Sequence, residues 1–592
     1  MKGPRHRLPL YIAAALALLG IVLLIVGIVL IVRSNEKASE CRGSTSETDG
    51  GNPTATPTPS PVNRCASSAE AKRSGLDKFL NKVIDAYFDT HPNQIIYKLG
   101  VTQADIKRIY RPYDPSPANI KKVTDRAMEL YYEISNATIS EASLKPREKK
   151  ALYQVKHYLK HIFATPYDGN YYAGDFLMGP NLFCWQPMCS INSEIRTTFL
   201  NFKPSTIADF ELLREKLSLL NGTFHQYIAN MRYGVQAGMV RSVEECKAGL
   251  DSWKREFLEI SRRGPRGVFF ETGLKGLLSD SFLSNLMNNS QETAKWEATH
   301  NKTVNESMRQ FLFESIGESV HAVNSLDWNF NVLTDIHRLF KSLTKRPVFS
   351  ERPGPKFEEW SVNAHEARPG HHTQVQGLVE HFRDNCGDSV TWLDTATSYT
   401  AFSEGWGLYA ENPLVARDTD TYDGEPFQKY GMLKWQIWRA LRLIVDTGLH
   451  YQGFNRSLAL DYFAKYAWDT SDGAEKEVTR YQSDPGQATA YMIGQLHIIK
   501  LRKYAEDKLG KTFNLKDFHF YLLSQGSAPL SYLESSIHEY VRCVLSSGKG
   551  EGCSDVLSPI PSPEARAGAT DRRRVEDGED FPPEFPLPDE YF

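Results

Sequence analysis

The chain has 592 residues, of which 41% are hydrophobic, an ordinary content for a globular protein with a large core. Its formal net charge of −3 lacks the basic excess of a nucleic-acid-binding domain, so we expect no nucleic-acid partner. These quantities leave the oligomeric state open.

The first distinct segment is an uncharged apolar run of 23 residues, 10–32. As a helix it spans roughly 34 Å, enough to cross a hydrocarbon layer of about 30 Å. The run exceeds the apolar region of a signal peptide, about 7–15 residues, and no small-residue cleavage pattern follows it. Lys2, Arg5 and Arg7 precede it and favour a cytosolic N-terminus. We predict a single-pass type II membrane protein, in which residues 1–33 form the cytosolic end and signal anchor. The membrane itself is not specified.

Composition divides the remainder of the chain into three parts. Residues 34–67 are rich in Ser, Thr, Pro and Gly, which bury too little apolar surface to fold, and predict a stalk. Residues 68–553 contain neither an internal repeat nor a second linker, so we expect one large extracellular or luminal domain. Residues 554–592 are rich in proline and charge and predict a disordered tail.

Sequons and cysteines agree with a location outside the cytosol. Six N-x-[ST] glycosylation sequons follow the anchor, at Asn136, Asn221, Asn288, Asn301, Asn305 and Asn455. The eight cysteines are even in number, which suits an oxidising compartment. Close spacing suggests two local bridges, Cys184–Cys189 and Cys543–Cys553. A stalk bridge Cys41–Cys65 would then leave Cys246–Cys386, although eight cysteines allow 105 pairings and the connectivity stays open.

The pattern within the large domain is helical. Residues 76–88 carry apolar side chains at helical spacing along one stripe. Similar patterns occur at 210–230, 308–321, 328–343 and 530–541. We therefore predict a mainly α fold with a cleft, which still allows a small β element.

The candidate metal site begins at His365. His365 and the glutamate after it open like the zinc-peptidase signature H-E-x-x-H, but Pro369 occupies the position of the second histidine. On an unbroken helix His371 would lie roughly 120° around the axis, and His372 roughly 10 Å along it. Neither would then share an ion with His365, because Zn–N bonds are about 2.0–2.1 Å long.

A break in the helix removes this difficulty. Pro369 disfavours the α conformation before it, and Gly370 permits almost any turn. If both are extruded as a bulge, His371 occupies the place of the second histidine. We therefore favour His371 as the ligand and keep His372 as the alternative.

Two further carboxylates complete the proposed site. Glu404 lies 39 positions after His365, far enough for the chain to return on another helix, and is the candidate third ligand. Two histidines and a glutamate leave the fourth zinc position open for water. Glu366 is placed to accept a proton from that water. Glu411 shares a helical face with Glu404 and is a candidate partner for a ligand histidine, although it also suits a solvated carboxylate. A rival pair, His157 and His161, lacks an adjacent glutamate and is interpreted as structural.

These residues carry a resemblance to a known family. The motif H-E-x-x-P-G-H-H at 365–372, followed by E-G-W-G at 404–407, resembles the hallmark of the domain of unknown function 885 family. This family looks like a distant relative of the thermolysin-type zinc peptidases. Further matching segments lie at 439–450 and 480–495, and the resemblance extends from about residue 70 to 545. It implies a helical domain that binds zinc between helices and hydrolyses peptide-like bonds.

The resembling segments also supply candidates for a donor to the substrate oxygen, which gains negative charge during hydrolysis. These are Tyr491, His450, Arg480 and Tyr481. Related zinc peptidases place a tyrosine from a C-terminal helix in this role, so the resemblance favours Tyr491.

The sequence thus predicts a membrane-anchored zinc metallopeptidase with Glu366 as general base and a peptide or peptide-like substrate. Two alternatives remain: a zinc hydrolase of a non-peptide amide or ester, and a catalytically silent ectodomain that binds a partner. The choice between endo- and exopeptidase activity is open.

Overall fold

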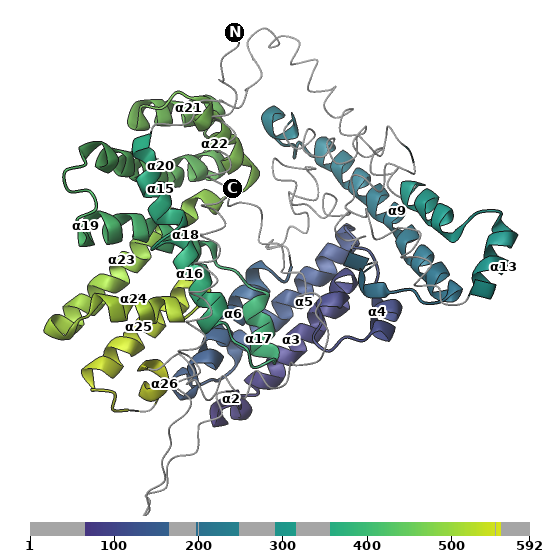
Figure 1. Cartoon of the computed structure of the whole chain (residues 1–592), viewed down its shortest axis with the longest axis horizontal. Helices are drawn as coiled ribbons and strands as arrows, with labels where there is room; N and C mark the ends of the chain where they lie inside the picture. Colours follow the sequence, from purple (N-terminus) through teal and green to yellow (C-terminus); the bar gives the residue numbers. More distant parts are fainter. Residues whose placement is uncertain are drawn as a thin grey trace, which may run out of the picture. The chain divides into compact units, whose positions relative to one another are not determined.

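The computed structural model describes residues 65–164, 197–198, 200–247, 264, 290–314, 356–550 and 552–557. These residues are mainly α-helical, which confirms the predicted fold class, and none of them forms a strand (Figure 1). No described helix is both long and apolar enough to span a membrane. The predicted anchor, the stalk up to Arg64 and the tail from residue 558 lie outside the described residues. From Cys65 onward the chain forms one compact unit, separate from Met1–Arg64.

The first group of helices forms the N-terminal part of this unit. Its members are α2 (Ala69–Ser74), α3 (Leu76–Thr90), η1 (Pro92–Tyr97), α4 (Gln103–Ile109), α5 (Pro117–Asn136), η2 (Glu141–Ser143) and α6 (Pro146–His161). The longer α9 (Ile207–Gln236) and the shorter α13 (Ser290–His300) follow.

The second group surrounds the candidate site. It begins with η4 (Lys356–Glu358), α15 (Glu359–Glu366), α16 (His371–Gly377), η5 (Leu378–Phe382), α17 (Ser389–Thr395), α18 (Thr400–Tyr409), η6 (Ala410–Val415) and α19 (Ala416–Asp418). It continues with α20 (Pro426–Tyr451), α21 (Arg456–Tyr462), η7 (Phe463–Ala467), α22 (Asp472–Ser483), η8 (Gln487–Thr489), α23 (Ala490–Leu509), η9 (Gly510–Thr512), α24 (Leu515–Ser524), α25 (Leu530–Leu545) and α26 (Cys553–Leu557).

The predicted amphipathic segments form helices wherever the structure describes them. Residues 76–88 lie in α3, whose buried side chains are those of the predicted apolar stripe, and residues 210–230 lie in α9. Residues 530–541 lie in α25, and the part of 308–321 that is described is helical. The segment 328–343 falls outside the described residues.

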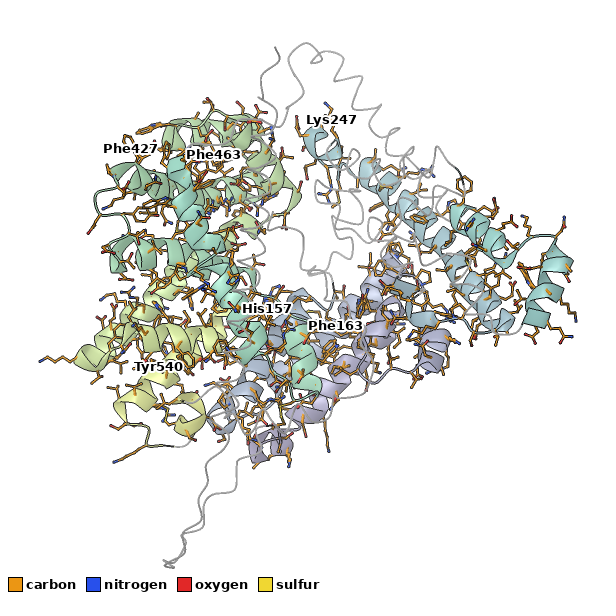
Figure 2. The ribbon with its side chains drawn as sticks, viewed as in Figure 1. His157, Phe163, Lys247, Phe427, Phe463 and Tyr540 are labelled. Atoms are coloured by element: carbon orange, nitrogen blue, oxygen red, sulfur yellow. A yellow bond between two sulfur atoms is a disulfide. The ribbon has the colours of Figure 1, made fainter. Side chains whose placement is uncertain are left out.

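In the part of the chain that the structure describes, three hydrophobic clusters stabilise these helices. The first joins α2, α3, α5, α6 and α17 and includes Phe163. The second joins α18, α23, α24, α25 and α26 and includes Tyr540, and the third joins α20, α21, α22, η7 and η8 and includes Phe463. Figure 2 labels one residue of each cluster. The site lies where α15, α16 and α18 meet helices of the second and third clusters.

Two glycines bring α18 and α23 into backbone contact. A Cβ atom on Gly494 would lie 1.8 Å from the carbonyl oxygen of Ala401, and one on Gly405 would lie 2.5 Å from the Cα atom of Gly494. Any larger residue would therefore force the helices apart. This close crossing fixes the position and rotation of α18 relative to α23, and α18 is the helix that carries Glu404.

The disulfides correct part of the predicted connectivity. The predicted bond Cys543–Cys553 is confirmed. Cys65 bonds to Cys386, 321 positions away, so the predicted pairs Cys41–Cys65 and Cys246–Cys386 are wrong. Cys246 is a free thiol, and burial raises its pKa to about 11. The pair Cys184–Cys189 lies outside the described residues.

The structure also separates the sequons by exposure. Asn136, Asn221, Asn301 and Asn455 are exposed, as a glycan acceptor requires. Asn305 is buried, so the prediction of a glycan at this position conflicts with the folded packing. Asn288 lies outside the described residues.

We expect the double variant Cys65→Ser/Cys386→Ser to lose about 2–4 kcal/mol of stability, because the bond restricts a long loop in the unfolded chain. Thermal unfolding of the variant beside the wild type measures the loss. Cys246→Ser, which removes a thiol outside any disulfide, is the control and should leave the unfolding temperature unchanged. A non-reducing peptide map that links Cys41 to Cys65 would contradict the observed pairing.

Candidate metal centre

The helix that carries His365 stops one residue later and resumes at His371. Residues 367–370 form a turn between α15 and α16, as the Pro369-Gly370 pair predicted. A Cβ atom at position 370 would lie 1.7 Å from the carbonyl oxygen of His365, so only glycine allows the chain to fold back so closely. The turn brings His371 beside His365, with ring centroids 4.6 Å apart.

Three buried side chains converge at this point. The Nε2 atom of His365 lies 3.2 Å from Oε2 of Glu404, and the Nε2 atom of His371 lies 3.4 Å from the same oxygen. One ligand atom from each of the three residues lies within 4.8 Å of the others. In a tetrahedral zinc site with bonds of about 2.0–2.1 Å, neighbouring donors are about 3.3 Å apart. The donor set and its spacing therefore fit a zinc ion.

The second ring nitrogen of His365, Nδ1, contacts another buried carboxylate, that of Glu411. The Nδ1 atom lies 2.7 Å from Oε1 of Glu411, and the hydroxyl of Ser361 donates to the other carboxylate oxygen. Glu411 is 1% exposed. If Nδ1 carries the proton and donates it to Glu411, the lone pair of Nε2 points towards Glu404 and His371. This is the tautomer of His365 that metal coordination requires. Glu411 thus occupies the place that its helical spacing predicted.

Charge at the cluster follows from these contacts. Burial lowers the pKa of His365, but hydrogen bonds to Glu404 and Glu411 outweigh it and raise that pKa to about 9. Burial raises the pKa of Glu404, but the hydrogen bonds and charges of His365 and His371 outweigh it and hold that pKa far below its usual range. The carboxylates therefore favour a positive charge between them, and a divalent cation would supply one.

Each residue of the E-G-W-G motif has its own role in the structure of the cluster. Glu404 supplies a donor, and Gly405 permits the crossing with α23. The indole of Trp406 donates to the carbonyl oxygen of Pro369 at 3.0 Å and so holds the turn between α15 and α16. A Cβ atom on Gly407 would lie 2.6 Å from Nε2 of His365, so this glycine makes room for the imidazole ring.

The remaining motif residues lie at the edge of the cluster. His372, the alternative ligand, is exposed and is not part of the donor set. Glu366 is also exposed, at the end of α15, so its carboxylate is open to water and to a substrate.

Two of the four predicted donor residues lie beside the cluster. The ring of Tyr491, at the start of α23, lies 6.1 Å from the ring of His365 between centroids. Arg480, on α22, donates to the Tyr491 hydroxyl at 3.2 Å. The two side chains therefore form one polar unit next to the three donors.

The other two predicted donors hold helices together instead. His450 donates through Nε2 to the carbonyl oxygen of Tyr481 at 2.8 Å, which joins α20 to α22. The Tyr481 hydroxyl donates to Glu477 at 2.7 Å and accepts from Arg442 at 3.2 Å, and its side chain is fully buried. These contacts engage their polar groups between helices, and neither residue belongs to the set of three donors.

Arg439, which was not predicted as a site residue, also lies beside Tyr491. Its guanidinium lies 5.0 Å from the centre of the Tyr491 ring and 4.9 Å from that of Trp435. Its positive charge also acts to lower the pKa of His365. Its position could have marked it as a site residue from the sequence, because Arg439 begins the family-like segment 439–450 on the helix that also carries Arg442.

Two other features were compared with this cluster. Figure 2 labels His157, which lies on α6. Its ring centroid is 4.7 Å from that of His161, and its ring also contacts Tyr399. Burial lowers the pKa of His157 to about 4. Neither histidine belongs to the group of three potential ligands found among the described residues.

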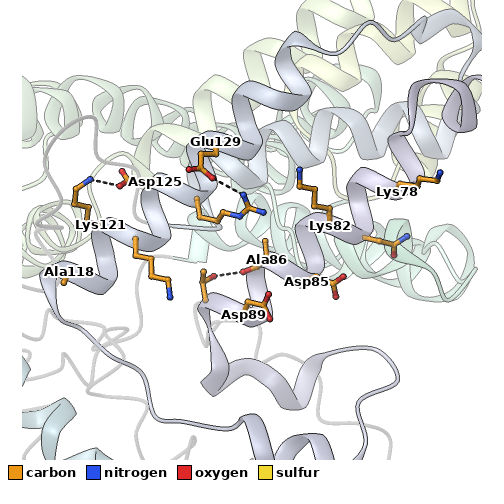
Figure 3. Close-up of a pocket in the computed structure, with 13 residues that line it drawn as sticks. Lys78, Lys82, Asp85, Ala86, Asp89, Ala118, Lys121, Asp125 and Glu129 are labelled. Carbon is orange, nitrogen blue, oxygen red and sulfur yellow. Dashed lines mark hydrogen bonds and ion pairs between the residues drawn. The ribbon is translucent and has the colours of Figure 1, made fainter.

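A surface hollow of about 950 Å³ lies along α3 and α5 (Figure 3). Its lining mixes lysines with carboxylates, and ion pairs such as Lys121–Asp125 and Arg126–Glu129 bind these charges to each other. Such pairs are typical of a solvated surface. The hollow contains none of the residues of the histidine cluster.

The chain is similar to one family profile and to solved structures of other proteins. Residues 334–537 match a family profile described as "Bacterial protein of unknown function (DUF885)". The solved structure of a candidate lipoprotein from Colwellia psychrerythraea has a TM-score of 0.53 at 17% identity, over 79% of this chain and 99% of that one. A candidate lipoprotein of unknown function from Shewanella oneidensis has a TM-score of 0.51 at 14% identity, over 77% and 98%. No curated protein matches the chain. At these identities the solved structures show a shared fold.

We expect Gly407→Ala to destabilise the protein by about 1–3 kcal/mol, because the His365 ring or the α18 backbone must move to admit the methyl group. Thermal unfolding measures the change. The matched control is Gly222→Ala in α9, where a Cβ atom would meet nothing within 4 Å. This control should be neutral or stabilise by up to about 1 kcal/mol. Equal behaviour of the two variants would contradict the steric role of Gly407.

Proposed function

We propose that the chain is a zinc-dependent hydrolase that cleaves peptide bonds. The observation that supports this most directly is the buried donor set of His365, His371 and Glu404, with distances of 3.2 and 3.4 Å that suit a tetrahedral ion. Three protein ligands are the number found in catalytic zinc sites, which keep a fourth position for water. Glu411, hydrogen-bonded to His365, is the kind of carboxylate that orients ligand histidines in such sites.

The reaction roles follow from position and chemistry. Zinc, when bound, would lower the pKa of a water to about 7 and polarise the scissile carbonyl group. Glu366, exposed and adjacent to His365, accepts the proton of the attacking water and then delivers it to the leaving amine.

Tyr491 is the proposed donor to the substrate oxygen that gains negative charge. Its ring lies beside that of His365, and Arg480 holds its hydroxyl. Since Arg480 donates to that oxygen, the phenolic proton is directed elsewhere and is available to a substrate. Hydrogen-bond donors at such positions contribute about 10²–10³ to the rate of acyl-transfer enzymes.

The same proposal includes a location outside the cytosol, with residues 10–32 as a type II signal anchor. The bonds Cys65–Cys386 and Cys543–Cys553 support it, because disulfides persist mainly in oxidising compartments. Exposed sequons at Asn136, Asn221, Asn301 and Asn455 agree with it.

We expect the purified wild type to contain about one zinc per chain, in line with one three-ligand site. His365→Ala, His371→Ala and Glu404→Ala should each lose most of it, since each removes one of three donors. Elemental analysis after dialysis measures the content. His372→Ala, which removes an exposed histidine one position from a ligand, is the matched control and should keep the zinc. Absence of zinc from the wild type after reconstitution would refute the proposal.

We expect Glu366→Gln to keep its zinc and to lose about 10²–10⁴ in kcat, because the amide no longer accepts a proton. The assay measures release of new amino termini from a mixture of peptides, with equal zinc content as the condition for comparison. Glu359→Gln, which neutralises another exposed glutamate of α15, is the control and should retain activity. Cleavage of esters but not of peptides by the wild type would change the substrate class and keep the metal site.

A further inference from the structure

Three arginines surround the ring of Tyr491. Arg439 and Arg442 lie one turn apart on α20, with guanidinium carbons 5.0 and 4.5 Å from the ring centre. Arg480 approaches from α22 and donates to the hydroxyl. Because arginine stays protonated at all ordinary pH values, this region contains three positive charges within a few ångströms of one ring.

The described carboxylates do not pair with all of these charges. Glu477 lies 2.7 Å from Arg442 and 3.6 Å from Arg480. No carboxylate among the described residues lies within ion-pair distance of Arg439, whose Nε and Nη1 atoms are buried without a hydrogen-bond acceptor. The Nη1 atom of Arg442 is also buried without a hydrogen-bond acceptor. A buried guanidinium without a directly paired carboxylate destabilises the folded chain.

Neutral donors next to these arginines also lack acceptors. The buried Nε2 atom of Gln487 and the indole Nε1 atom of Trp435 have no acceptor among the described residues. Trp435 lies against the Arg439 guanidinium, and Gln487 accepts a hydrogen bond from Arg480. A set of donors without acceptors around these arginines suits an anion with several acceptor oxygens.

We propose that Arg439 and Arg442 form a carboxylate-binding subsite that holds the C-terminal carboxylate of a peptide beside the metal centre. The planar fork of a guanidinium matches the two oxygens of a carboxylate, and stacking on Trp435 and Tyr491 orients the Arg439 fork. This inference rests on the proposed function, because it assigns the subsite to a peptide substrate. The Arg439 guanidinium and the His365 ring both lie near Tyr491, at 5.0 and 6.1 Å from its ring centre. Each substrate residue spans about 3.3–3.6 Å. The bound carboxylate therefore belongs to a residue close to the cleaved bond, and the enzyme removes short C-terminal fragments.

Binding without turnover tests the subsite. Three ligands are titrated calorimetrically into the full-length chain carrying Glu366→Gln: N-acetyl-alanyl-phenylalanine, its C-terminal amide, and N-acetyl-aspartyl-phenylalanine amide. The first offers a C-terminal carboxylate, the second offers none, and the third offers a side-chain carboxylate. We expect the free acid to bind at least about tenfold more tightly than either amide, the size of effect typical of a charged hydrogen bond.

The same titrations in arginine variants identify the residue. Arg439→Gln should reduce the preference for the acid to within about twofold, and Arg439→Lys, which keeps the charge but not the fork, should give an intermediate value. The control Lys500→Gln removes one exposed positive charge on α23 and should keep the full preference. Thermal unfolding of each variant verifies the fold.

The outcomes separate this inference from the proposed function. Equal affinity for acid and amide, including no detectable binding of either, would overturn the subsite, as would a preference that survives Arg439→Gln. Equal binding of the acid and the aspartyl amide would overturn the C-terminal assignment. Preference for the acid in a chain that holds no zinc and cleaves no peptide would refute the proposed function and leave the subsite standing.

Discussion

The arrangement of the site depends on one buried imidazole held between two buried carboxylates. His365 comes from α15, whereas Glu404 and Glu411 come from α18 and from η6 directly after it. All three groups are almost fully buried, and each would be strongly destabilising without the others. Their contacts therefore fix the distance and rotation of α15 against α18. Gly407 and Gly370 allow this approach, since a side chain at either position would collide with His365.

Much of the fold followed from the sequence because amphipathic periodicity is local. The stripe from Leu76 to Ile84 is buried in α3, and the equivalent stripe of α25 is buried around Ile537. Pairing between distant segments has no such local signal. Cys65 bonds to Cys386 because tertiary packing brings α2 near the loop before α17, and proximity in sequence favoured Cys41 instead. The same limit applies to Asn305, whose burial comes from its neighbours in space rather than from its sequon.

The candidate site was predictable to the extent that it follows helix geometry. The turn between His365 and His371 follows from Pro369 and Gly370, and the helical spacing of Glu404 and Glu411 places both carboxylates on one face. The roles of Trp406 and Gly407 were not predictable, because they depend on which atoms lie opposite once α15 reaches α18. His450 and Tyr481 were predicted as donors to a substrate, and the structure places their polar groups in contacts between helices. A polar side chain in a family-like segment serves either a substrate or a neighbouring helix, and only the contacts distinguish the two.

Charge balance connects the metal centre to the arginines around Tyr491. In the proposed zinc state, the two negative charges of Glu404 and Glu411 equal the two positive charges of the ion, so the centre itself is close to neutral. Glu477 offsets one of the two arginines that it contacts. The other of these two arginines and Arg439 then have no carboxylate of their own among the described residues, and in a region of low dielectric their positive charges act strongly on nearby groups. Under the proposed function, a neutral metal centre beside unbalanced arginines would orient an anionic substrate, with its negative end at the arginines and its amide bond at the metal.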